Sequence, residues 1–173
     1  MNEITTICTM YCSPLGPLTL TGGANGRLNA VRFPGAGAPD GADFRPGAFE
    51  TAIAQLDEYF AGARREFELE LELNGTPFQQ RVWDALRAIP YGTTISYGEL
   101  ARIIGRPDRV RAVGSAVGAT PVPIIVPCHR VIGADGSLTG YGGGLARKRA
   151  LLELEGAGWG AARGVSAGQL SLV

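Results

Sequence analysis

Cysteine, histidine and arginine follow one another at positions 128–130, and these residue types together could carry out nucleophilic chemistry. An imidazole and a guanidinium beside a thiol favour the thiolate, which is the nucleophilic form of cysteine. His129 is the only histidine of the 173 residues, and Cys128 is one of three cysteines. The alternative is a buried structural cysteine, because free cysteine often serves as a small core residue. The residue types at 128–130 alone leave both interpretations open.

The segments around Cys128 could hold it in place and build a pocket. Residues 121–127 contain three prolines among valine and isoleucine, which predicts a stiff, extended segment with few free N–H donors. Residues 140–144 are four glycines around one tyrosine. Such a loop permits close approach of backbone amides to a ligand, or it is only a connection. It matches no phosphate-binding loop, because no Gly-Lys-Ser or Gly-Lys-Thr follows it.

Helix signals dominate the second half of the chain. Capping boxes at residues 76–79 and 96–99 predict the starts of two helices. A further helix is expected over residues 108–118, with two arginines and several small residues, and a last one over residues 145–155. The helices that start at 96 and 108 flank a brief turn and make a helix-turn-helix candidate, although small residues equally suit ordinary helix packing.

The first half of the chain is predicted to be a sheet with one helix. Apolar runs and turn signals predict three strands, at residues 4–12, 17–22 and 27–33. A loop rich in glycine and proline over residues 34–47 leads into an amphipathic helix over residues 47–61. Glutamates alternate with apolar residues at 66–73, which predicts a half-buried strand with one acidic face.

Composition limits the classes of protein to consider. The chain is long enough for one domain or two small ones, and 45% hydrophobic with 18% charged residues is a globular composition. No apolar stretch approaches the roughly 18 residues of a membrane span, and no secretory signal is visible. Three cysteines make no disulfide framework, so we expect a cytoplasmic protein in a reducing environment.

Charge is unevenly placed along the chain. Residues 1–75 hold ten acidic and five basic residues, a net charge of −5. Residues 76–173 hold six acidic and eleven basic residues, a net charge of +5. This asymmetry indicates an anionic partner such as nucleic acid for the second half, or it reflects chance and the acidic strand.

Five blocks of the second half resemble the O6-alkylguanine-DNA alkyltransferases in sequence, order and spacing. They are residues 78–83 (FQQRVW), 89–98 (IPYGTTISYG), 111–114 (RAVG), 125–132 (IVPCHRVI) and 140–144 (GYGGG). The resemblance is strong over residues 76–156 and looser over residues 1–75, where the Ser13–Gly16 turn and the strand pattern agree. Because five blocks agree in order and spacing, the resemblance favours a reactive Cys128 over a buried structural cysteine.

The resemblance implies an α+β fold in two domains. A small domain with an antiparallel sheet and a helix would span residues 1–75. A mostly helical domain with a winged-helix-like helix-turn-helix would span residues 76–156, and residues 157–173 would form a flexible tail.

The resemblance also implies a suicide reaction that needs no cofactor. Cys128 would take the alkyl group, typically methyl, from O6 of guanine, or from O4 of thymine, in duplex DNA, and each molecule would act once. His129 would serve as general base toward Cys128 through a bound water, because adjacent side chains on an extended segment diverge. Glu155 would orient the imidazole, and Tyr97 would donate a proton to guanine N3.

The implied partner is double-stranded DNA carrying O6-alkylguanine, bound by a monomer through the minor groove after the base has left the stack. Arg111 would fill the space vacated by the base. The residues expected at the DNA surface are Arg111, Ala112, Ser115, Thr94 and Thr120. Those expected to form the guanine pocket are Pro123, Val131, Tyr141 and Gly142.

Thr120 departs from the family pattern, which usually has asparagine before the proline that follows the recognition helix. A hydroxyl replaces only part of what an amide donates and accepts, so we predict a working but slower or less stable protein. The zinc site of some family members is not expected, because Cys8 and Cys12 lack a histidine partner.

Three other functions compete with alkyl transfer. A non-catalytic sensor of alkyl lesions is one, although the related sensors carry tryptophan in place of the reactive cysteine. A regulatory DNA-binding protein is another, although it would need an extra metal-binding module for which 173 residues leave no room. A cysteine hydrolase lacks the separate, distant histidine that it would require.

Overall fold

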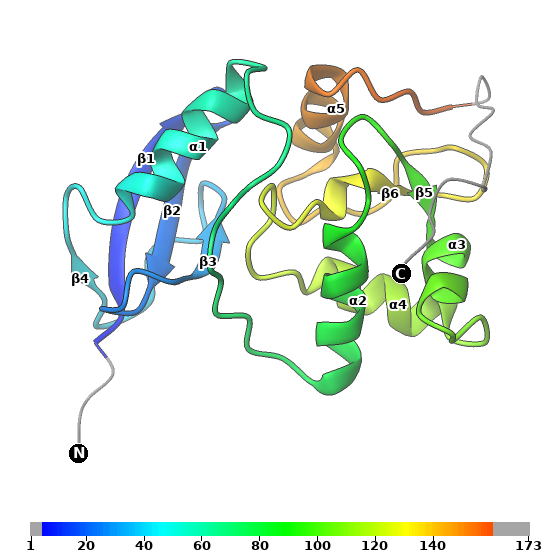
Figure 1. The fold of residues 1–173 in the computed structure, drawn as a ribbon, viewed down its shortest axis with the longest axis horizontal. Helices are drawn as coiled ribbons and strands as arrows, with labels where there is room; N and C mark the ends of the chain where they lie inside the picture. The colour runs from blue at the N-terminus through cyan, green and yellow to red at the C-terminus, as the bar shows by residue number, and fades with distance from the viewer. Residues whose placement is uncertain (1–4, 161–173) are drawn as a thin grey trace. The chain divides into compact units, whose positions relative to one another are not determined.

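The computed structural model describes residues 5–160, whose contacts divide the chain into two units (Figure 1). Unit 1 is the chain up to Asn74 together with Pro121–Ile125, and unit 2 is Gly75–Thr120 and the chain from Val126 on. The Val31 amide donates to the Pro121 carbonyl at 2.9 Å, so the segment before the cysteine belongs with the first half. The domain ranges 1–75 and 76–156 stay a prediction. Of the predicted tail, residues 157–173, the part from residue 161 on lies outside the described residues.

Unit 1 is a four-stranded sheet with one helix along it (Figure 1). Its elements are β1 (Ile7–Ser13), β2 (Gly16–Gly22), β3 (Leu28–Arg32), β4 (Asp43–Phe44) and α1 (Glu50–Phe60). The strand order is β3-β2-β1-β4, with β4 parallel to β1 and the other pairs antiparallel. The three predicted strands and the helix are therefore present. Leu18 and Leu20 of β2 are fully buried, as are Leu56 and Tyr59 of α1, and they form the core of this unit.

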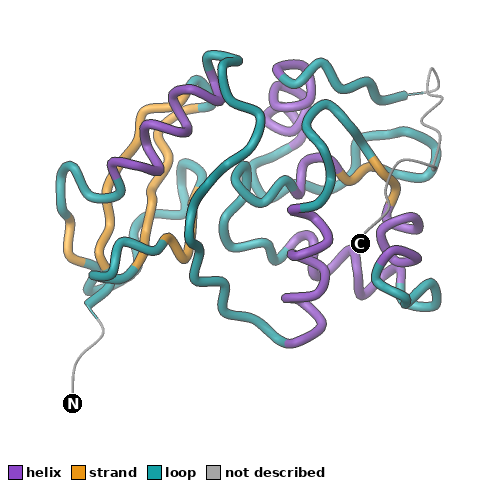
Figure 2. Tube along the Cα trace, in the orientation of Figure 1, coloured by secondary structure: helices purple, strands orange, loops and turns teal. Residues whose placement is uncertain are grey.

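Two details of unit 1 differ from the sequence prediction. The acidic segment at 66–73 is half-buried on alternate residues but is no strand: its one bridge joins Leu71 to Leu28, and Figure 2 draws it as loop. Its backbone bonds instead to a side chain, since Gln55 donates to the Glu68 carbonyl at 3.1 Å and accepts from the Glu68 amide at 2.8 Å. Within the predicted loop, two residues pair with β1 as the short strand β4.

Unit 2 is mostly helical. Its elements are α2 (Pro77–Arg87), β5 (Ile95–Ser96), α3 (Tyr97–Ile103), α4 (Val110–Gly118), a 3₁₀ turn η1 (Cys128–Arg130), β6 (Val131–Ile132) and α5 (Leu145–Leu154). Both predicted capping boxes are present, at Thr76 and Ser96. The Trp83 indole donates to the Ala116 carbonyl at 2.9 Å and joins α2 to α4. The residues described contain no helix that is both long and apolar enough to cross a membrane.

The segment that leads into Cys128 is not extended, contrary to the prediction. Residues 124 and 125 form a turn, and Ile124 has φ of 75°, a strained value for a β-branched residue. Cys128 itself begins a 3₁₀ turn. The prolines explain the failure of the prediction, because residues without an N–H cannot sustain a strand ladder and often mark bends.

Candidate active site

Cys128 lies where the 3₁₀ turn meets a very short parallel sheet. The Cys128 amide donates to the Val126 carbonyl at 2.8 Å, and the Arg130 amide donates to the Pro127 carbonyl at 3.0 Å. The next residue, Val131, pairs with Ile95 of β5. Since β5 runs directly into α3, the first residue of that helix, Tyr97, lies on the segment beside the cysteine turn. Two residues of pairing thus bring together segments more than thirty positions apart in sequence.

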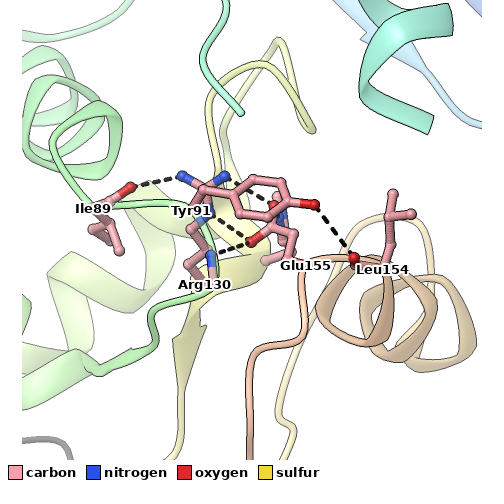
Figure 3. A network of polar contacts seen from close by, with 7 residues as sticks. Ile89, Tyr91, Arg130, Leu154 and Glu155 are labelled. Atoms are coloured by element: carbon pink, nitrogen blue, oxygen red, sulfur yellow. Dashed lines mark hydrogen bonds and ion pairs between the residues drawn. The ribbon is translucent and has the colours of Figure 1, made fainter. Parts of the chain in front are cut away.

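The carboxylate of Glu155 is the centre of a buried polar network (Figure 3). Its Oε1 lies 2.7 Å from His129 Nε2 and accepts from Arg130 Nη2 at 2.9 Å. Its Oε2 accepts from Arg130 Nε at 2.9 Å and from the Gly92 amide at 3.2 Å. The side chains of His129 and Glu155 are completely inaccessible to solvent. Gly92 has φ of 76°, a conformation that glycine adopts readily, and this directs its amide at the carboxylate.

Arg130 completes the network and was not singled out as a site residue by sequence. Its Nη1 donates to the Ile89 carbonyl at 2.6 Å, and its guanidinium lies 5.8 Å from the centre of the Tyr91 ring (Figure 3). The Tyr91 hydroxyl in turn donates to the Leu154 carbonyl at 3.3 Å. The guanidinium is therefore committed to Glu155 and not, as its position in the sequence suggests, to the thiol of Cys128.

The network determines which groups are charged. Burial would raise the pKa of Glu155, but the hydrogen bonds from His129 and Arg130 outweigh it and hold that pKa well below its usual value. Burial lowers the pKa of His129 more strongly than Glu155 raises it, so the imidazole is neutral at pH 7. The resting network therefore contains one carboxylate, one guanidinium and a neutral imidazole.

The pKa of the Cys128 thiol is set by burial, a hydroxyl and an ammonium. Burial raises the pKa of the thiol to about 11, while the Thr120 hydroxyl and the positive charge of Lys148 act in the opposite direction. The thiol is thus protonated at neutral pH in the protein without a ligand. Sequence reasoning missed Lys148, although a signal was present: it is the one lysine among the 16 basic residues.

Models of the 6-O-methylguanine DNA methyltransferases match nearly all of the described chain. The model of the ribonuclease-like domain matches residues 6–73, and that of the DNA binding domain matches residues 77–157. The chain belongs to this family. The resemblance seen in the sequence is thereby confirmed, as is the α+β fold with a sheet in the first half and helices in the second.

Close relatives support the same assignment. The methylated-DNA--protein-cysteine methyltransferase of Mycobacterium tuberculosis is 58% identical, over 83% of this chain and 88% of its own length. That of Mycobacterium leprae is 54% identical, over 86% of this chain and 91% of its own length. The crystal structure of Mycobacterium tuberculosis O6-methylguanine methyltransferase matches with a TM-score of 0.82 and 54% identity, over 88% of this chain and 93% of that one. The structure of the Mycobacterium tuberculosis protein with DNA matches with a TM-score of 0.82 and 56% identity, over 86% and 92% of the two chains.

With the family established, the predicted reaction residues lie together in unit 2. Cys128, His129 and Glu155 are buried around the turn and the end of α5. The Tyr97 hydroxyl donates to the Thr139 carbonyl at 3.1 Å. A β-carbon added to Gly114 of α4 would lie 3.8 Å from the Tyr97 ring, so the tyrosine packs closely against that helix.

The residues predicted to bind DNA fall into two groups. Arg111 and Ser115 are exposed on α4, and Ala112 between them is half-buried. Thr94 is buried, with its hydroxyl donating to the Gly158 carbonyl at 3.4 Å. The Thr120 hydroxyl donates to the Val117 carbonyl at 2.7 Å, and the residue is half-buried. The winged-helix-like arrangement of α3 and α4 stays a prediction.

The predicted pocket residues are spread over both units. Val131 is buried in unit 2, where Tyr141 is half-buried and Gly142 is exposed. Pro123 is buried and belongs to unit 1. In residues 5–160 no group of three or more histidine, cysteine, aspartate or glutamate side chains is placed to hold a metal ion.

Replacing the central carboxylate should destabilise the protein strongly. We expect Glu155→Gln to lower the free energy of unfolding by about 3–5 kcal/mol, because it leaves the buried Arg130 guanidinium without a counter-charge. The matched control is Glu153→Gln, an exposed carboxylate of the same helix, which should change it by less than about 0.5 kcal/mol. Urea denaturation at pH 7 measures both, and equal midpoints for the two variants would contradict the central role of Glu155.

The single histidine should make stability depend on pH. Because the folded pKa of His129 lies below its unfolded value of about 6.5, the unfolded chain binds the extra proton first. Stability is then complete above pH 6.5 and falls as the pH drops below it, by up to about 1.4 kcal/mol per pH unit. Urea midpoints between pH 7 and 5 should fall in the wild type and stay nearly level in His129→Gln. Parallel curves for the two proteins would exclude the histidine as the cause.

Proposed function

We propose that the protein repairs alkylated DNA by direct reversal, with Cys128 taking an alkyl group from O6 of guanine, or O4 of thymine, once per molecule. One observation carries the proposal: the only histidine directly follows Cys128 in the chain and is held by a buried carboxylate. Membership of the family and relatives named methylated-DNA--protein-cysteine methyltransferase support the same reaction. The crystal structure of the Mycobacterium tuberculosis relative in complex with DNA supports DNA as the partner.

His129 is suited to act as the base. Its Nε2 donates to the Glu155 carboxylate, which leaves Nδ1 as the acceptor of the neutral ring. That Nδ1 is buried and has no hydrogen-bond partner among the residues described. A buried acceptor without a donor costs free energy, so it favours a state in which a proton is delivered to it. We infer that the proton of Cys128 reaches Nδ1 through a water molecule, and that Glu155 stabilises the imidazolium formed.

The transfer step then conserves atoms and charge. The thiolate sulfur attacks the alkyl carbon in line, the bond between that carbon and O6 breaks, and its electron pair passes to the purine. Tyr97 donates its proton to N3, so the base leaves neutral. The imidazolium of His129 and the phenolate of Tyr97 recover their resting states by proton exchange with solvent. The thioether formed on Cys128 is stable, which limits each molecule to one turnover.

Helix α4 is the proposed contact with the DNA minor groove. Its exposed Arg111 can enter the stack in place of the flipped base, and the small Ala112 and Ser115 allow close approach to the groove walls. The net charge of +5 over residues 76–173 attracts the phosphates without selecting a sequence. Pro123, Val131, Tyr141 and Gly142 would receive the base, and the protein would act as a monomer.

Intact-protein mass tests the reaction directly. The wild type, mixed with a duplex containing O6-methylguanine, should gain the mass of one methylene group, and peptide mapping should place it on Cys128. Cys128→Ala should gain nothing. No gain by the wild type, together with tighter binding of the damaged than of the undamaged duplex, would replace the proposal with a lesion sensor. Neither gain nor binding would overturn the function altogether.

Thr120 should assist the cysteine through its single hydroxyl. That hydroxyl donates to the Val117 carbonyl and also lowers the pKa of Cys128, so its one hydrogen must turn to the sulfur as the thiolate forms. We expect the isosteric Thr120→Val to slow methyl transfer roughly two- to tenfold, the worth of one neutral hydrogen bond. Thr120→Asn, with the family's usual residue, should raise the transfer rate or the melting temperature. Single-turnover rates and thermal melts measure both effects. If neither variant differs from the wild type in transfer rate or in melting temperature, the proposed role of Thr120 is contradicted.

A further inference from the structure

Lys148 is the only lysine of a chain that has fifteen arginines, and it is completely buried. It projects from α5, and its ammonium donates to the carbonyls of Val131 at 2.5 Å, Thr139 at 2.8 Å and Gly140 at 3.2 Å. An ammonium has three N–H donors, so all of them are used. These carbonyls belong to β6, immediately after the cysteine turn, and to the start of the glycine-rich loop.

No carboxylate lies within ion-pair distance of Lys148 in the described part of the chain. The one buried carboxylate of unit 2, Glu155, is bonded to His129 and Arg130. A buried ammonium without a counter-charge is costly, and burial lowers the pKa of Lys148 to about 8. Three carbonyls offset part of this cost in the resting protein, and the counter-charge would come from the Cys128 thiolate once it forms, because the ammonium and the thiolate favour each other.

We propose that Lys148 is a positioning residue of the alkyl transfer, whose buried ammonium stabilises the Cys128 thiolate and ties together the three carbonyls beside the reacting groups. The inference rests on the proposed function, which it deepens. Its charge also disfavours protonation of His129, which keeps the imidazole available as a base. The side chains that act on the Cys128 thiol are then Lys148 and Thr120, and those that act on His129 are Glu155, Arg130 and Lys148.

The geometry explains why lysine is kept at this position. Three carbonyls around one point suit a compact, tetrahedral ammonium, whereas a guanidinium is planar and spreads five donors over a fork. Arginine serves at Arg130, where the partner is a carboxylate that accepts two N–H groups side by side. Arg130 and Lys148, the two buried cations among the described residues of unit 2, therefore differ in type because their acceptors differ in shape.

Lys148 also supports Tyr97. The Thr139 carbonyl accepts from both the Tyr97 hydroxyl, at 3.1 Å, and Lys148 Nζ, at 2.8 Å. When Tyr97 turns to protonate the leaving purine it must give up this bond, and the carbonyl then still has the ammonium as a donor. Because no buried acceptor is left unpaired, the release of the tyrosine hydroxyl costs less.

The test measures the reactivity of Cys128 without DNA. Iodoacetamide alkylation of Cys128, followed by peptide mass against pH, reports the thiol pKa independently of lesion recognition. Lys148→Met should shift the profile to higher pH and slow alkylation at pH 7.5 by about tenfold, corresponding to one pKa unit. Lys148→Arg, which keeps the charge, should recover most of that reactivity, yet still transfer methyl from an O6-methylguanine duplex more slowly than the wild type. Arg149→Met, which removes an exposed cation one residue further on, should match the wild type.

Each outcome separates this inference from the proposed function. If Lys148 were only structural, Lys148→Met would melt at a lower temperature but its alkylation profile against pH would match that of the wild type. That result would overturn the inference, whereas methyl transfer by the wild type would still support the proposed function. If the wild type itself transfers no methyl group, the proposed function fails whatever the profiles show.

A reciprocal measurement needs no substitution of the lysine. Protein labelled with ¹³C-lysine gives one side-chain signal apart from any added tag, because Lys148 is the only lysine. Its titration midpoint, near pH 8, should coincide with a break in the pH profile of Cys128 alkylation, because the thiol pKa rises once the neighbouring ammonium has lost its proton. A profile without a break at that midpoint would show that the ammonium and the thiolate do not interact, and would overturn the inference even if Lys148→Met does not fold.

Discussion

The buried carboxylate of Glu155 is the interaction on which the rest of the site depends. It accepts hydrogen bonds from a backbone amide, an imidazole and a guanidinium, and these hold it ionised where burial alone would protonate it. The same bonds join three segments far apart in the chain: the loop after α2, the cysteine turn and the end of α5. A change in this one charge therefore alters both the fold of unit 2 and the orientation of His129, the proposed base.

Burial keeps the thiol of Cys128 protonated in the ligand-free protein. Burial raises its pKa to about 11, and the two groups that favour the thiolate, Thr120 and Lys148, do not overcome that effect in the ligand-free protein. A cysteine used once per molecule gains from this arrangement, because a protonated, buried thiol is protected from adventitious oxidation and alkylation. The unpartnered Nδ1 of His129 is the acceptor that can take the proton when a base occupies the pocket.

Much of the molecule follows from local sequence. The capping boxes at Thr76 and Ser96, the strands of the first half and the last helix lie within a few residues of their predicted positions, because each depends on neighbours along the chain. The predicted strand at 66–73 failed because alternating burial does not by itself provide a partner strand, and its backbone bonds to Gln55 instead. The extended segment before Cys128 failed because its prolines favour a bend.

The sequence by itself determined the reactive cysteine, its adjacent histidine, the family and the helices that carry them, since these are properties of residue type and spacing. Only the tertiary structure decided which charges meet. It committed Arg130 to Glu155, buried Thr94, bonded the Thr120 hydroxyl to the Val117 carbonyl and placed Lys148 on the carbonyl of Val131, directly after the cysteine turn. Electrostatic partners are set by distance in space and by burial, and neither can be read from the order of residues when the partners lie twenty or more positions apart.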